Sequence, residues 1–120
     1  MVHFDKTWFG GVIIDGTEFC DVLVIGNEVI DRESIVPGWF DDNSHHTVYG
    51  HELKELLKGN PEVIIIGNGQ SSVLRVPKEI TTEIEKRKIE LIVLETTKAV
   101  EEYNKLAKKK RVNALIHTTC

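Results

Sequence analysis

The sequence predicts an α/β fold in a single domain, with a parallel β-α-β-α-β C-terminal half and an N-terminal β-hairpin region. Apolar runs at residues 63–66 and 91–94 lack polar alternation, which is typical of strands covered on both faces. Together with residues 112–116 they form two consecutive β-α-β units, so the three strands of this C-terminal half are expected to be parallel. Asp15-Gly16, between two apolar runs, predicts an N-terminal β-hairpin region.

Short strands are expected throughout the N-terminal third. Residues 11–14 lead into the hairpin turn, and residues 17–25 form the returning strand. Gly26-Asn27 marks a second turn, and residues 28–31 fit a third short strand. Residues 34–50 are rich in turn-forming residues and predict a long loop, a kind of segment that often carries function.

Three helices and one further strand are expected after this loop. Residues 51–58 predict the first helix, because their leucines fall on one helical face and a Gly-Asn-Pro sequence follows that would end the helix. Residues 73–76 fit a short strand, and Pro77 suits the first position of the second helix. Thr96 or Thr97 can cap the third helix. The apolar stripe of that helix consists of Ala99, Val100, Tyr103, Leu106 and Ala107.

Composition narrows the class of protein. The chain has 120 residues, of which 41% are hydrophobic and 28% charged, and this size predicts one domain over residues 1–120. A net charge of −4 argues against nucleic-acid binding and against attraction to an anionic membrane. Two cysteines are too few for a disulfide scaffold, and no signal-peptide pattern or membrane-length apolar run is present. We expect a soluble, cytoplasmic protein without a cofactor.

The carboxyl ends of the parallel strands predict where a ligand would bind, because ligands of open parallel sheets lie beyond these ends. Glycine-rich turns there let backbone amides approach an anion, although the glycines could equally serve the turn alone. The dinucleotide pattern G-x-G-x-x-G is incomplete because position 72 is Ser. A small anionic or polar ligand fits better. The candidate ligand-binding residues are Gly67, Asn68, Gly69, Gln70, Ser71, Thr96 and Thr97.

His117 and Cys120 follow the last strand and are the candidates for nucleophilic or redox catalysis. A thiolate is the reactive form of cysteine, and a neighbouring histidine can activate it. The terminal carboxylate disfavours the thiolate, however, and side chains three positions apart on a strand point to opposite faces. The alternative is a structural histidine that donates to a backbone carbonyl, beside a thiol packed as a small hydrophobe. No catalytic residue is therefore assigned.

The predicted loop contains a metal-like cluster. Histidine and carboxylate suit zinc or another divalent ion, but no recognised ligand spacing is present, and a solvated loop explains the residues equally well. No metal is assigned. The weak metal candidates are His45, His46 and His51, with Asp41 and Asp42 nearby.

Trp39 and Phe40 are bulky aromatic residues in the same loop. Such residues are frequent anchors of protein interfaces, so both are candidates for contact with a partner. The alternative is that the two rings form a lid over the core.

Five short motifs can be read in order along the chain: Phe9-Gly10; Trp39 with His45 and His46; residues 66–69 (I-G-N-G); Thr97-x-Ala99-x-x-x-Tyr103-Asn104; and His117-Thr118-Thr119-Cys120. Their order and spacing resemble the Mth-type domain, a family of small α/β proteins founded on a methanobacterial hypothetical protein. The sequence departs from that family at Asn68, where many relatives have Thr, and at Lys110, near a common glycine. The resemblance implies a three-layer, sandwich-like α/β fold with a central mixed sheet, and no agreed enzymatic activity. Its relatives include a mitochondrial complex I assembly factor and an adipogenesis-associated protein, which implies protein binding.

Two functions are compatible with these observations. The favoured one is a non-enzymatic protein-interaction or assembly module, because the catalytic constellation is incomplete and the family resemblance points to protein partners. The alternative is a small-ligand or anion binder, or an enzyme, that uses the strand ends with His117 and Cys120. Neither function involves nucleic acid or a membrane.

Overall fold

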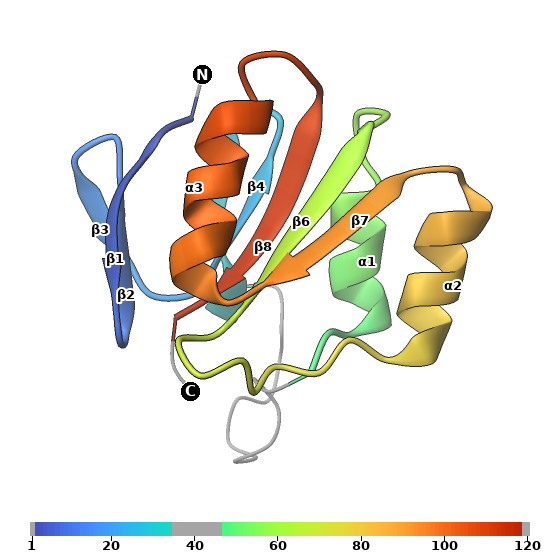
Figure 1. Ribbon diagram of the computed structural model, residues 1–120, viewed down its shortest axis with the longest axis horizontal. Helices are drawn as coiled ribbons and strands as arrows, with labels where there is room; N and C mark the ends of the chain where they lie inside the picture. Colours follow the sequence, from blue (N-terminus) through green and yellow to red (C-terminus); the bar gives the residue numbers. More distant parts are fainter. Residues whose placement is uncertain (1, 35–46, 119–120) are drawn as a thin grey trace.

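A five-stranded mixed sheet forms the centre of the molecule in the computed structural model, which describes residues 2–34 and 47–118 (Figure 1). Its strand order is β5 (Glu28–Asp31), β4 (Val22–Ile25), β8 (Val112–His117), β6 (Val63–Asn68) and β7 (Glu90–Leu94). β4 runs antiparallel to both β5 and β8, whereas β6 runs parallel to both β7 and β8. The predicted parallel β-α-β-α-β half is therefore confirmed.

The central position of β6 brings the carboxyl ends of the parallel strands to one edge of the sheet. The strand register places Asn68 opposite His117 and Gly67 opposite Leu94. β6 and β8 are almost completely buried, as expected for strands covered on both faces. The prediction that residues 91–94 are buried is wrong, because β7 is the edge strand and its Val93 is 39% exposed. An apolar run alone does not distinguish an edge strand from a central one.

Helices cover both faces of this sheet. α1 (Gly50–Leu56) and α2 (Lys78–Lys86) pack on one face, and α3 (Thr96–Leu106) packs on the other (Figure 1). Successive residues of a strand point to opposite faces, so β6 contributes Ile64 to the core under α1 and α2, and Ile65 to the core under α3. The predicted fold class, a compact α/β domain with a central mixed sheet, is confirmed.

A second, antiparallel sheet packs against α3. It consists of β1 (Phe4–Trp8), β2 (Gly11–Ile14) and β3 (Thr17–Phe19), in that order. The predicted hairpin turn joins β2 and β3, and β1 adds a strand that the sequence did not reveal. The Phe4 ring meets the Tyr103 ring of α3 edge-on, with 5.0 Å between ring centroids. This contact joins the small sheet to the main core.

The prediction of one returning strand over residues 17–25 is wrong. The chain leaves the small sheet after Phe19 and enters the central sheet at Val22. Asp21 lies in this link and is only 7% exposed. A buried carboxylate needs hydrogen-bonding partners, and those of Asp21 lie on β8 and beyond β5. The change of sheet thus follows from long-range contacts that a local pattern does not contain.

The segment before α2 also differs from the prediction. Residues 73–76 form no strand of a sheet, and one isolated bridge joins Arg75 to Thr47.

Within residues 2–34 and 47–118, no helix has the length and apolar character needed to cross a membrane.

Candidate functional site

Two of the predicted ligand-binding residues, Gly69 and Thr96, and the catalytic candidate His117 meet through one hydroxyl group. The Thr96 side-chain oxygen accepts a hydrogen bond from the Gly69 backbone N–H at 2.9 Å and donates to the His117 carbonyl at 2.5 Å. The Thr96 N–H in turn donates to the Gly69 carbonyl at 3.1 Å. Thr96 is fully buried, so these bonds connect the ends of β6 and β8 to the start of α3. The Gly69 amide is therefore already occupied by the protein itself.

Gly67 is explained by the close approach of α3 to β6. A Cβ atom added at this position would lie 3.1 Å from Ile116 Cδ1, 3.1 Å from Thr96 Oγ1 and 3.2 Å from Ala99 Cβ. Protein atoms thus fill the space that the missing side chain leaves. Gly69 has a φ of +102°, which suits the turn that follows β6.

Gln70 connects the strand ends to the small sheet. Its amide nitrogen donates to the Thr7 hydroxyl at 3.2 Å and to the Trp8 carbonyl at 3.0 Å. Its amide oxygen accepts from the Thr97 hydroxyl at 3.1 Å. The Ser71 side chain is exposed next to it. The predicted ligand donors Gln70 and Thr97 are therefore also engaged within the chain.

Asn68 is the exception among these residues. Its side-chain oxygen is buried and has no hydrogen-bond partner in the part of the chain that the structure describes. Asn68 lies opposite His117 in the parallel ladder. A buried acceptor without a partner is uncommon in folded proteins, so this oxygen has hydrogen-bonding capacity that the described protein leaves unused.

A buried ionic network lies beneath this edge of the sheet, and sequence reasoning missed most of it. It comprises Asp21, Arg32, Glu52, His117 and Thr118, all of which are buried. Arg32 belongs to a short 3-10 helix (Arg32–Ser34) after β5, Glu52 to the first turn of α1, and His117 to the end of β8. Segments far apart in the sequence are therefore joined through charged side chains.

Arg32 is the cation of the buried ionic network. Its guanidinium Nη1 donates to Asp21 at 3.0 Å, and Nε and Nη2 donate to the two oxygens of Glu52 at 2.5 and 3.1 Å. Nη2 also donates to the Thr47 carbonyl at 2.7 Å. Glu52 accepts a further bond from the Tyr49 N–H at 3.0 Å, which caps α1. The planar guanidinium suits this two-pronged contact better than an ammonium group.

The Asp21 carboxylate also interacts with His117 and Thr118 at the end of β8. His117 Nδ1 lies 2.6 Å from one carboxylate oxygen, and the Thr118 N–H and hydroxyl donate to the other at 2.8 and 3.0 Å. An ionised carboxylate only accepts, so His117 Nδ1 carries the proton. Burial of Asp21 disfavours its ionised form and by itself would raise the pKa of this carboxyl. The hydrogen bonds from His117 and Thr118, together with the charges of His117 and Arg32, outweigh burial and lower the Asp21 pKa. The Nδ1–H of His117 is thus directed at the Asp21 carboxylate.

Several candidates lie outside the described residues, namely Trp39, Phe40, His45, His46 and Cys120. His51 is exposed, and its ring stacks on the Tyr49 ring with 5.6 Å between centroids. Among residues 2–34 and 47–118, no group of three or more metal-ligating side chains is arranged around a common point.

An exposed aromatic turn lies next to the strand ends. We call residues 8–10, which connect β1 and β2, the Trp8–Phe9 turn; Trp8 is 36% exposed and Phe9 66% exposed. The Gly10 N–H donates to the Thr118 carbonyl at 2.8 Å, and Gln70 holds the Trp8 carbonyl. Gly10 adopts a φ of +99°, which permits the turn. The Phe9-Gly10 motif was the signal for this surface, but its exposure could not be read from the sequence.

The fold and these residues define a small α/β domain in which most polar groups at the strand ends bond to each other. Residues 4–117 match the family described as a protein of unknown function (DUF498/DUF598). The chain belongs to this family, the Mth-type domain family, as its motifs predicted.

Solved structures show the same fold. A conserved hypothetical protein, PH1505 from Pyrococcus horikoshii OT3, is 28% identical, with 98% of each chain covered and a TM-score of 0.84. A protein named MT938 is 31% identical over 100% of both chains, with a TM-score of 0.78. A Bartonella henselae protein described as an outer membrane protein is 25% identical, with a TM-score of 0.68, and the match covers 99% of this chain and 96% of that one.

Proposed function

We propose that this chain is a non-enzymatic protein-interaction module whose contact surface is the Trp8–Phe9 turn. The observation that carries the proposal is that Phe9 is 66% exposed on a turn that hydrogen bonds hold at both Trp8 and Gly10. A large aromatic side chain on a fixed backbone loses little conformational entropy when it binds, which is why such residues are frequent interface anchors.

The chemistry of the turn indicates the kind of partner. The Phe9 side chain is largely exposed, so the partner would supply an apolar pocket for its ring. Trp8 adds a flat surface that packs over Gly11. The polar rim consists of Gln70, which is partly buried, and Ser71, which is exposed. An apolar centre with a polar rim is the usual composition of a protein interface.

Site-specific photocrosslinking tests this function. A benzoylphenylalanine residue at position 9 is expected to give one main crosslinked product with a cellular protein, and the same group at exposed Lys86 on α2 should not. Excess unlabelled wild type should suppress the product, whereas Phe9→Ala should not suppress it. Because Phe9 lies outside the core, this variant is expected to remain folded. Equal crosslinking at positions 9 and 86 would refute the proposed surface.

The alternative function, ligand binding or catalysis at the strand ends, has one observation in its favour, the unpartnered oxygen of Asn68. A nucleophilic Cys120 predicts rapid reaction with iodoacetamide at neutral pH. Cys20 serves as the internal reference, because burial and the nearby acids Glu33 and Asp21 raise its pKa and slow its reaction. Equal, slow labelling of both thiols would contradict a catalytic role for Cys120.

A further inference from the structure

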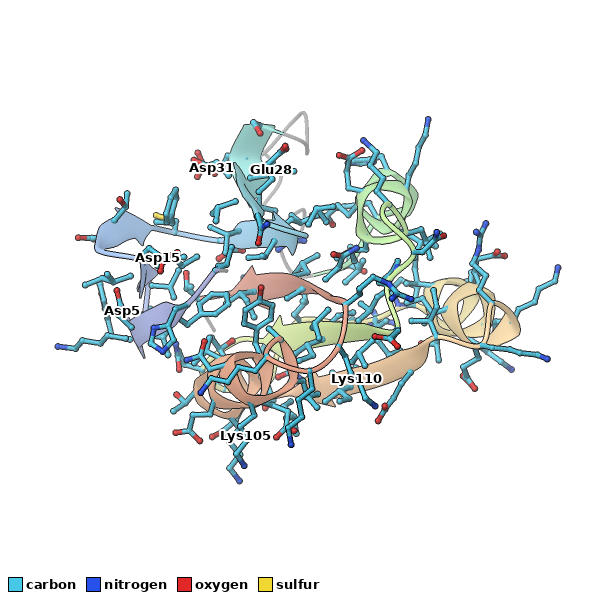
Figure 2. All side chains as sticks on the ribbon, turned by 90° about the horizontal axis from the view of Figure 1, so that it is seen from above. Asp5, Asp15, Glu28, Asp31, Lys105 and Lys110 are labelled. Atoms are coloured by element: carbon cyan, nitrogen blue, oxygen red, sulfur yellow. The ribbon has the colours of Figure 1, made fainter. Side chains whose placement is uncertain are left out.

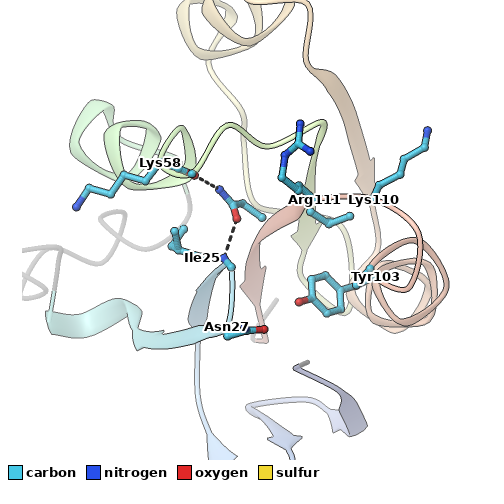
Figure 3. Close-up of a pocket in the computed structure, with 11 residues that line it drawn as sticks. Ile25, Asn27, Lys58, Tyr103, Lys110 and Arg111 are labelled. Carbon is cyan, nitrogen blue, oxygen red and sulfur yellow. Dashed lines mark hydrogen bonds between the residues drawn. The ribbon is translucent and has the colours of Figure 1, made fainter.

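A pocket opens at the opposite end of β8 from the Trp8–Phe9 turn. It lies between the β4–β5 turn, the residues after α1 and the α3–β8 turn, and its volume is about 440 Å³ (Figure 3). Pockets for small molecules typically measure roughly 300 to 1,000 Å³. Ile25, Ala107, Val112 and the ring of Tyr103 give this Tyr103 pocket apolar walls. It could therefore enclose the apolar body of a small molecule.

The shape of the pocket is fixed by Asn113. Its side-chain oxygen accepts from the Gly26 N–H at 3.0 Å, and its nitrogen donates to the Lys58 carbonyl at 2.8 Å (Figure 3). The same nitrogen also donates to the Leu56 carbonyl at 2.8 Å. These bonds join β8 to the β4–β5 turn and to the end of α1. Asn113 has used its hydrogen-bonding groups in this way, so it forms a wall and leaves ligand recognition to other residues.

The Tyr103 hydroxyl is a polar group of the pocket that the described protein leaves unused. The residue is only 2% exposed, and its hydroxyl lies on the side of Asn27 and makes no hydrogen bond with a described residue (Figure 3). Burial, with a smaller contribution from Asp15, raises the pKa of Tyr103 to about 12, so the hydroxyl keeps its proton. The hydroxyl oxygen keeps some solvent-accessible surface in the pocket, so an acceptor atom of a ligand can replace water as its hydrogen-bond partner.

The charged residues that line the pocket are all basic, namely Lys58, Lys110 and Arg111. Lys58 pairs with Glu55 at 2.8 Å, whereas Lys110 has no ion pair with a described residue. Viewed from above, Lys105 and Lys110 lie on the α3 side, away from Glu28 and Asp31 (Figure 2). Asp15 is exposed, so water and salt screen its repulsion. The positive rim favours an anionic ligand.

We propose that the Tyr103 pocket binds a small carboxylic acid with an apolar body. The body packs against Ile25, Ala107 and Val112, and a carboxylate oxygen accepts from the Tyr103 hydroxyl. Lys110 and Arg111, whose side chains point outward at the rim in Figure 3, attract the carboxylate through their positive charge without contacting it. This site is independent of the protein-binding surface, because the two lie at opposite ends of β8.

Nuclear magnetic resonance titration of the ¹⁵N-labelled chain tests the proposal with three probes. Octanoate carries both the apolar body and the charge, 1-octanol carries only the body, and acetate carries only the charge. Octanoate is expected to shift the amides of Gly26, Gly59 and Val112 in a saturable manner. Octanol and acetate should bind at least about tenfold more weakly, since each lacks one of the two contributions. No saturable shift with octanoate, or equal binding of octanol, would overturn the proposal.

Two variants separate the roles of the hydroxyl and of the charge. Tyr103→Phe removes one hydrogen bond to the ligand and should weaken octanoate binding about three- to tenfold. Because the hydroxyl has no partner within the described protein, this variant should remain folded. Tyr49→Phe, which removes a hydroxyl away from the pocket, is the matched control and should leave the affinity unchanged. Lys110→Gln should weaken octanoate but not octanol. Wild-type affinity in both pocket variants would refute the proposed mode of binding.

Discussion

Replacing Arg32 with methionine tests how strongly the buried ionic network stabilises the fold. The substitution removes the cation that donates to Asp21, to both oxygens of Glu52 and to the Thr47 carbonyl. Glu52 is completely buried, so water cannot replace the lost partner. Breaking a buried ion pair from one side typically destabilises a protein by about 3 to 5 kcal/mol. That is a large part of the roughly 5 to 15 kcal/mol that stabilises a domain.

Urea unfolding followed by circular dichroism measures this effect. With a slope of about 2 kcal/mol per molar urea, a loss of about 4 kcal/mol lowers the midpoint by about 2 M. Arg87→Met is the matched control, because Arg87 forms an exposed pair with Glu83 at 2.8 Å. Such pairs contribute about 0 to 1 kcal/mol, so the control midpoint should hardly move. Similar midpoints for the two variants would refute the importance of the buried network.

A double-mutant cycle separates the Arg32–Glu52 pair from other effects of the substitution. Glu52→Gln removes the charge but keeps an oxygen that can accept from the Tyr49 N–H. Once Glu52 is neutral, the loss of Arg32 leaves a smaller uncompensated charge. The double variant should therefore be about 1 to 3 kcal/mol more stable than the sum of the single effects implies. Strict additivity would mean that the two side chains do not stabilise each other.

Three further predictions follow from the same structure. Gly67→Ala should lower stability by about 1 to 3 kcal/mol in urea unfolding, because its Cβ would crowd Ile116 and Ala99, whereas Gly50→Ala, with open space around it, should not. Because the pKa of Asp21 is lower in the folded than in the unfolded protein, its ionised carboxylate contributes stability above about pH 4. This stability is lost as the pH falls through the pKa that Asp21 has in the folded protein. In thermal melts at different pH values, Asp21→Asn should abolish this part of the acid dependence. Tyr103, with a pKa raised to about 12, contributes stability that is lost between about pH 10 and 12, by at most about 2 to 3 kcal/mol. Tyr103→Phe should remove that alkaline loss, and a loss of unchanged size would contradict the assigned pKa.

The parallel half of the fold could be predicted because its signals are local. The run at residues 63–66 and the two connections of helical length specify β6, β7, β8 and their direction without any knowledge of contacts. The strand β1 was missed because apolar and polar residues alternate only weakly along it. The passage of the chain from the small sheet to the central sheet at Asp21 was missed because it depends on contacts with Arg32 and His117. Local periodicity cannot report partners that lie up to 96 positions away.

The candidate site could be located only in part. Because the three predicted strands run parallel, the sequence indicates that Gly69, Thr96 and His117 lie at the same edge of the sheet. The structure places these residues in one hydrogen-bonded group. What the sequence could not show is that their donors and acceptors satisfy each other. The roles of Arg32 and Glu52 were also hidden, because charged residues are usually exposed and nothing local marks these two as buried. Ligand-binding roles for the strand-end residues stay predictions.

The contact between Asn104 and Phe4 has a consequence for solubility. β1 is an edge strand, and such an edge can recruit a strand from another molecule. The Asn104 side-chain amide accepts from the Phe4 N–H at 3.0 Å and donates to the Phe4 carbonyl at 2.9 Å, as a neighbouring strand would do. A helix residue thereby blocks one position of the open edge against intermolecular pairing. The helix on which the small sheet packs therefore limits intermolecular pairing along the β1 edge.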